Sequence, residues 1–66
     1  MIISRFTEPE LNRFRKLCNF VGDEILVFEY RSQGIPLEQI AEILDLSVDG
    51  VKKISRKVNK KIIKVL

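Results

Sequence analysis

The sequence predicts an all-α fold, a small four-helix domain whose last helix is long and basic. Apolar residues recur three and four positions apart in four separate stretches, which is the spacing of one buried helix face. The stretches are bounded by residues that begin or end helices, such as Thr7 and Ser47 at starts and Gly34 at an end. No stretch alternates apolar and polar residues as a half-buried strand does, so no sheet is expected.

Length and composition restrict the class of protein. A chain of 66 residues with 45% apolar content suits one packed domain, so residues 1–66 are expected to fold together. No apolar run approaches the ~20 residues that cross a bilayer, and Met1–Ser4 is too short an apolar start for a signal sequence. With one cysteine, Cys18, and no histidine, neither an internal disulfide, a metal site nor a cofactor is expected. Cys18 is expected to be buried, and a cytoplasmic location is the default.

The charges are unevenly distributed along the chain. Residues 1–50 contain all nine acidic residues and five bases, a net charge of −4, whereas residues 51–66 carry +7. The seven bases of the second part are Lys52, Lys53, Arg56, Lys57, Lys60, Lys61 and Lys64. Such an asymmetry points to a polyanionic partner for the last helix.

Two helices are expected in the first half of the chain. Thr7 followed by Glu10 is a capping-box pattern, which begins the first helix. The buried face of this helix is expected to comprise Leu11, Phe14, Leu17 and Cys18. The second helix opens at Asp23 and is apolar on most sides, which predicts that it is the central helix of the core. Gly34 is expected to end it in a left-handed conformation.

Residues 36–58 predict two further helices joined by a tight turn. Pro36 suits a first helical position, where no N–H is needed. The apolar stripe of this third helix is expected to comprise Leu37, Ile40, Ala41 and Leu44, widened by Ile43. Ser47 is a good N-cap for the fourth helix, which is expected to run from Val48 to about Leu66. Two helices joined by so short a turn cross steeply, which is typical of a helix-turn-helix unit.

A family resemblance is carried by the segments LEQIA (37–41), LDLS (44–47) and VKKI (51–54), preceded by the helix EILVFEYR (24–31). These segments resemble the DNA-binding fourth region of bacterial sigma factors and, more loosely, related regulators and short proteins of Gram-positive mobile elements. Two features depart from the family pattern. Asp45 stands where the family often has glycine, so an aspartate would adopt the left-handed turn conformation. Residues 48–50 (VDG) replace the long polar side chains of primary sigma factors.

In a helix-turn-helix, the first residues of the second helix reach base edges in the major groove. The base-facing positions are then Ser47, Asp49, Gly50, Lys52 and Lys53. Lys52 and Lys53 suit the acceptors of guanine, Asp49 suits the donor of cytosine, and Gly50 permits close approach. Phosphate contacts are expected from Arg56, Lys57, Lys60, Lys61, Gln39 and the backbone N–H groups near Leu37. A lysine-rich helix is often only a solvated surface, and it is the helix-turn-helix context that favours nucleic acid.

The expected function is a sequence-specific or semi-specific DNA-binding transcriptional regulator with double-stranded DNA as its partner. An enzyme is not expected, because the chain lacks histidine, a nucleophile–base pair and a phosphate-binding glycine loop. The alternative is a protein-interaction module that keeps the fold without reading DNA, either as a homo-oligomer or with RNA polymerase or a sigma-like partner. Residues 48–50, the acidic first half and the apolar tail favour this alternative.

The tail, residues 62–66, leaves two outcomes open. It carries more apolar surface than a small domain normally exposes. It is expected either to pack over the first helix or to form a homodimer surface.

Overall fold

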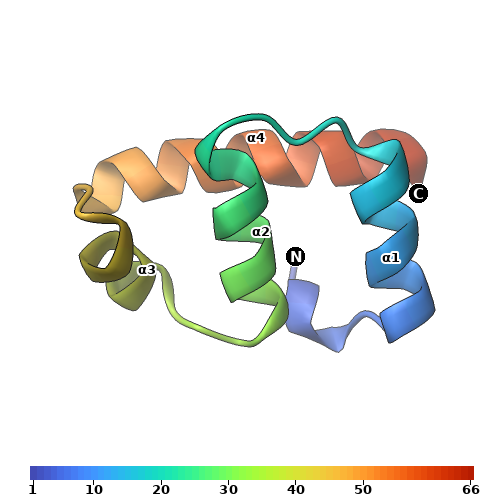
Figure 1. The fold of residues 1–66 in the computed structure, drawn as a ribbon, viewed down its shortest axis with the longest axis horizontal. Coiled ribbons are helices and arrows are strands. Elements are labelled where there is room, and N and C mark those ends of the chain that lie inside the picture. Colours follow the sequence, from blue (N-terminus) through green and yellow to red (C-terminus); the bar gives the residue numbers. More distant parts are fainter.

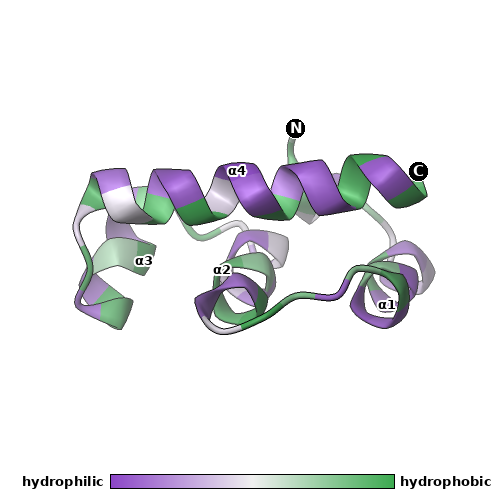
Figure 2. Cartoon of the chain, turned by 90° about the horizontal axis from the view of Figure 1, so that it is seen from above, coloured by the Kyte–Doolittle hydropathy of each residue, from purple (hydrophilic) through white to green (hydrophobic).

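The computed structural model describes all 66 residues, and the fold is all-helical as predicted. A short 3-10 turn precedes four α-helices: η1 (Ile3–Arg5), α1 (Glu8–Leu17), α2 (Asp23–Ser32), α3 (Leu37–Leu44) and α4 (Val48–Val65). The three shorter helices α3, α2 and α1 lie in that order along α4, all on the same side of it (Figures 1 and 2). The opposite side of α4 has no helix over it (Figure 2).

The predicted caps begin α1 and α4. Thr7 Oγ1 accepts a hydrogen bond from the Glu10 N–H, and the Glu10 carboxylate accepts one from the Thr7 N–H at 2.9 Å, so the capping box is confirmed. Ser47 Oγ accepts from the Gly50 N–H at 3.0 Å and begins α4 as predicted. The start of α3 differs by one residue. Pro36 has an extended backbone (ψ 152°), so it is the N-cap and Leu37 is the first helical residue.

Left-handed residues end α2 and α3. Gly34 has φ 82° and follows α2, as the sequence predicted. Asp45 has φ 55° and ψ 46° at the end of α3, a conformation that a short polar side chain tolerates better than most. The Leu46 N–H then donates to the Ala41 carbonyl at 2.9 Å, which closes the last turn of α3. The chain therefore passes from α3 to α4 in three residues.

The core has two parts that meet at α2. The first joins η1, α1, α2 and the second half of α4, and comprises Ile3, Leu11, Phe14, Cys18, Phe28, Val58 and Ile62. The second joins α2, α3 and the first half of α4, and comprises Val27, Ile40, Ala41 and Val51. Because α2 contributes to both parts, its predicted central position is confirmed. The predicted burial of Cys18 is confirmed as well.

The C-terminal tail packs over α1, which is one of the two outcomes that the sequence left open. Ile62 is fully buried in the first part of the core, and Val65 packs against it. Ile63 and Leu66 stay 59% and 70% exposed.

Leu17 corrects the predicted face of α1, because it is 51% exposed. Leu11, Phe14 and Cys18 fill the contact between α1 and α4, and no element covers the last turn of α1 on the side of Leu17. Ile25, Leu26 and Ile43 also remain partly exposed, since α2 and α3 are covered on fewer sides than their apolar content suggests.

Candidate nucleic-acid interface

The uncovered side of α4 carries half of the twelve basic side chains of the chain. Six cations on this helix are exposed, and none forms an ion pair within the molecule. We call them the basic face: Lys52, Lys53, Arg56, Lys57, Lys60 and Lys64. Figure 2 shows hydrophilic and hydrophobic residues alternating along α4, with the three shorter helices on one side of it.

The buried residues of α4 fix the direction of the basic face. Val51, Ser55, Val58 and Ile62 are buried and follow one another at intervals of four, three and four residues. This is the spacing of one side of an α-helix, so it sets the rotation of α4 about its own axis. The six cations occupy the positions between these residues. They therefore point to solvent along the full length of the helix.

The first turn of α4 lies at one end of the molecule, beyond the packing of α1 and α2 (Figure 1). Asp49 is exposed there, and the Ser47 hydroxyl already accepts a hydrogen bond as the helix cap. A Cβ added at Gly50 would lie 3.1 Å from Ser47 Oγ. A larger residue at position 50 would therefore need a small shift of the Ser47 hydroxyl, which the equivalent cap at Thr7 accommodates with Glu10. The close approach to a ligand that the sequence suggested stays a prediction.

Lys61 departs from the predicted set of phosphate contacts. Its ammonium group donates to the Glu24 carboxylate at the start of α2 and, at 2.6 Å, to the Asn19 carbonyl oxygen. Lys61 directly precedes buried Ile62, so it lies at the edge of the packed side of α4 and reaches the loop between α1 and α2. Lys61 is therefore engaged in contacts within the domain, and we leave it out of the proposed interface.

The Lys61 pair also determines the state of Glu24, which is only 8% exposed. The hydrogen bond from Lys61 lowers the pKa of the Glu24 carboxyl below its ordinary value, although burial alone would raise it. Glu24 thus stays ionised near neutral pH. Its carboxylate also accepts a hydrogen bond from the Val21 N–H at 3.2 Å.

The α3 positions are only partly available to a ligand. The Leu37 side chain packs against the second part of the core, so only its backbone N–H at the helix start is free for an anion. Gln39 is exposed and forms no side-chain hydrogen bond. The structure brings most of the predicted site residues of α4 together on one surface: Asp49, Lys52, Lys53, Arg56, Lys57 and Lys60. Lys64, which was not among the predicted site residues, lies on the same surface. The structure leaves Gln39 on the neighbouring helix and turns Lys61 inwards.

Sequence reasoning missed the residue that connects α4 to α2 and the N-terminus. The Arg31 guanidinium donates to Ser55 Oγ and Asn59 Oδ1, each at 2.7 Å, and to the Met1 carbonyl oxygen at 3.1 Å. No carboxylate pairs with Arg31, and its burial lowers the pKa of the guanidinium below the ordinary value. Ser55 and Asn59 are polar residues four apart on the buried side of α4, which was the available signal for a buried partner.

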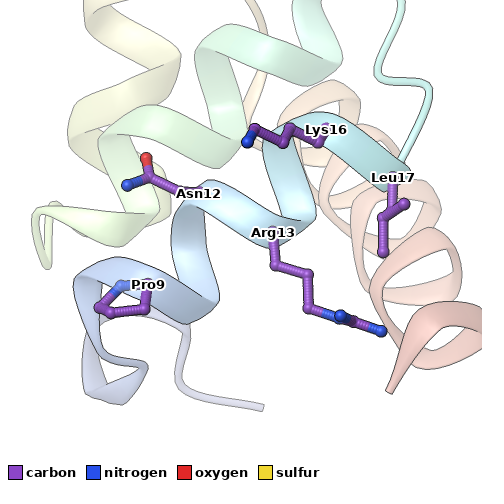
Figure 3. A pocket seen from close by; sticks show the side chains of 5 residues that line it. All are labelled: Pro9, Asn12, Arg13, Lys16 and Leu17. Atoms are coloured by element: carbon purple, nitrogen blue, oxygen red, sulfur yellow. The ribbon is translucent and has the colours of Figure 1, made fainter.

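The bases of α1 form a separate surface. Arg15 makes two hydrogen bonds to the Glu29 carboxylate, at 2.6 and 2.8 Å, and these raise the pKa of Arg15 and lower that of Glu29. Arg13 and Lys16 are exposed without partners. They border a shallow hollow on α1, shown in Figure 3 with Pro9, Asn12 and Leu17.

Comparison of the chain with protein-family models, with curated proteins and with solved structures found no match. None of the helices is both long and apolar enough to cross a membrane.

Proposed function

We propose that the protein is a DNA-binding transcriptional regulator that holds duplex DNA with α3, the turn at residues 45–47 and α4, as a helix-turn-helix unit does. The observation that carries the proposal is the basic face, six exposed cations without an internal partner on the one uncovered side of a single helix. A duplex carries closely spaced phosphates along two strands, so its charge complements such a surface. In this proposal the family resemblance of residues 37–54 and the basic face indicate the same partner.

The basic face has a cost for the isolated protein, which supports a ligand of opposite charge. Lys52 with Arg56, Lys53 with Lys57, and Lys60 with Lys64 are each four residues apart on one helix. A like-charge pair at this spacing destabilises a helix by roughly 0.2–0.5 kcal/mol. Bound phosphates would remove this repulsion.

The base-reading residues of the proposal are at the start of α4. Asp49, Lys52 and Lys53 lie in its first two turns, and all three are exposed. Lysine can donate to guanine O6 and N7, and aspartate can accept from cytosine N4. Few side chains are therefore available for base contacts compared with those available for phosphates. We expect a modest sequence preference on top of a large electrostatic contribution.

The proposal is tested by measuring duplex binding as a function of salt. We expect a fluorescently labelled duplex of random sequence to bind at about 50 mM KCl, with log K falling against log[KCl] at a slope of up to about −5 for six phosphate contacts. Selection from random duplexes should then return a preferred site. Absence of binding at low salt, or binding that salt does not weaken, would contradict the proposal.

A second candidate function is suggested by the exposed apolar residues at the end of α4. Ile63 and Leu66 are 59% and 70% exposed, which fits a protein-interaction module, either a homodimer or a complex with RNA polymerase or a sigma-like partner. Replacing both with serine tests the homodimer without removing buried Ile62. If this candidate is correct, sedimentation should show a dimer for the natural chain and a monomer for the variant. An unchanged mass would exclude a homodimer through these residues.

A further inference from the structure

We propose that α4 lies between the two phosphate strands of a major groove only along its first half, and that its second half follows a single strand. This inference rests on the proposed function and specifies how the duplex is held. It derives from an asymmetry within the basic face, whose cations form two rows of unequal length.

The long row comprises Lys53, Lys57, Lys60 and Lys64. Their intervals of four, three and four residues place them on one side of the helix from its second turn to its last. All four side chains are exposed. The long row therefore presents positive charge along nearly the whole of α4.

The short row comprises Lys52 and Arg56. The same intervals continue this row to positions 59 and 63, where neither residue is basic. Asn59 is half-buried, and its side-chain oxygen accepts a hydrogen bond from Arg31 at 2.7 Å. Ile63 is exposed and apolar. Positive charge on this side of α4 thus ends at Arg56.

Asp49 lies ahead of both rows, three residues before Lys52 and four before Lys53. A carboxylate is repelled by phosphates, so it is best placed along the middle of a groove, where base edges offer donors. The two rows then lie on either side of that line. This fits a helix in a major groove, which is about 12 Å wide and has a phosphate strand on each side.

A straight helix cannot stay in the groove along its whole length. The 18 residues of α4 extend about 27 Å, whereas the groove winds around the duplex once in about 34–36 Å. The second half of α4 must therefore leave the groove and pass over one of its strands. The loss of the short row after Arg56 occurs where this departure is expected.

The test compares variants that each lose two positive charges. They are K52Q/R56Q in the short row, K53Q/K57Q and K60Q/K64Q in the two halves of the long row, and R13Q/K16Q on α1 as a control of equal charge. We expect each α4 variant to make the salt slope shallower by about 1.8, and the control to leave it unchanged. An unchanged slope for K52Q/R56Q would place the first half against one strand and overturn the inference. An unchanged slope for K60Q/K64Q would mean that the second half contacts no phosphate strand, which would also overturn the inference.

Adding a cation where the short row stops gives the sharpest test. I63K should leave the slope unchanged, because no phosphate strand is expected on that side of the second half. A slope steeper by about 0.9 would mean that both halves lie between two strands, which contradicts the inference while keeping DNA binding intact. If the natural chain bound no duplex at all, the proposed function would fail as well. Circular dichroism of each variant checks that the fold is retained.

Discussion

Exchanging Lys52 and Lys53 for glutamate is expected to weaken duplex binding by more than about 100-fold at 0.1 M salt, because each phosphate contact contributes about 8-fold there and the new carboxylates add repulsion. The two lysines head the short and the long row, and both are exposed without an internal partner. Titration of a labelled duplex by anisotropy measures the loss.

The same double substitution should leave the stability of the domain nearly unchanged. Glutamates at positions 52 and 53 would each lie four residues before a cation, Arg56 and Lys57, but also three and four residues after Asp49. Pairs at this spacing are worth about 0.2–0.5 kcal/mol each, so the new attraction and the new repulsion largely cancel. We therefore expect the Tm to change by no more than a few degrees, since about 4–8 °C correspond to 1 kcal/mol in a domain of this size.

A matched control separates the site from the total charge. Arg13→Glu with Lys16→Glu changes the net charge equally, but on the separate surface of α1 shown in Figure 3. This control should retain most of the duplex affinity, since exposed charges beyond about 10 Å are largely screened at this salt. Retained binding by the α4 variant, or equal losses in both variants, would show that the first half of α4 does not contact DNA.

Local chemistry made much of the fold predictable from the sequence. The capping box at Thr7, the cap at Ser47 and the left-handed Gly34 each involve residues within a few positions of one another. The four helices and their order follow from these signals and the apolar spacing. The start of α3 was misplaced by one residue, because proline fits both the N-cap and the first helical position.

Contacts between distant residues were not predictable in the same way. Leu17 has the spacing of a core residue, yet it is exposed because no other element covers that side of α1. Arg31 contacts Ser55 and Asn59 on a helix that begins 17 positions later in the chain. The direction of the basic face was also unknown from the sequence, because it depends on which side of α4 the three shorter helices cover.

Lys61 is the clearest case of a role that sequence spacing does not assign. It is one of seven bases in a stretch without acids, and nothing local distinguishes it from Lys60 or Lys64. Its partner Glu24 lies 37 positions earlier in the chain. The place of Lys61 directly before buried Ile62 does not distinguish it either, because Lys57 stands directly before buried Val58. Because of its pairing with Glu24, Lys61 should differ from Lys60 and Lys64 in that its loss affects the stability of the domain more than duplex binding.

Replacing Lys61 by methionine is expected to lower stability by about 2 kcal/mol, or the Tm by about 10 °C, while duplex affinity changes by less than about twofold. The substitution leaves the Glu24 carboxylate, 8% exposed, with only the Val21 N–H as a close partner. The double variant E24Q/K61M should recover part of the loss, because an uncharged amide is easier to bury. Thermal unfolding by circular dichroism measures all three proteins.

The pH dependence of this loss gives a second, independent check. Lys61 lowers the pKa of Glu24, so the pair stabilises the natural chain above the ordinary carboxyl pKa, and this contribution disappears as pH falls through the lowered value. In the methionine variant burial is opposed only by the Val21 N–H and the charge of Lys57, so Glu24 takes up its proton at higher pH than in the natural chain and the penalty fades in acid. The Tm difference should therefore be largest near neutral pH and shrink as pH falls below the ordinary carboxyl pKa. Glu10 and Glu29, whose pKa values are also lowered, are present in both proteins and cancel in the difference. If the Tm difference between the natural chain and the methionine variant did not depend on pH, Lys61 would stabilise the fold through packing rather than through its charge. If the methionine variant lost most of its duplex affinity, Lys61 would belong to the DNA-binding surface.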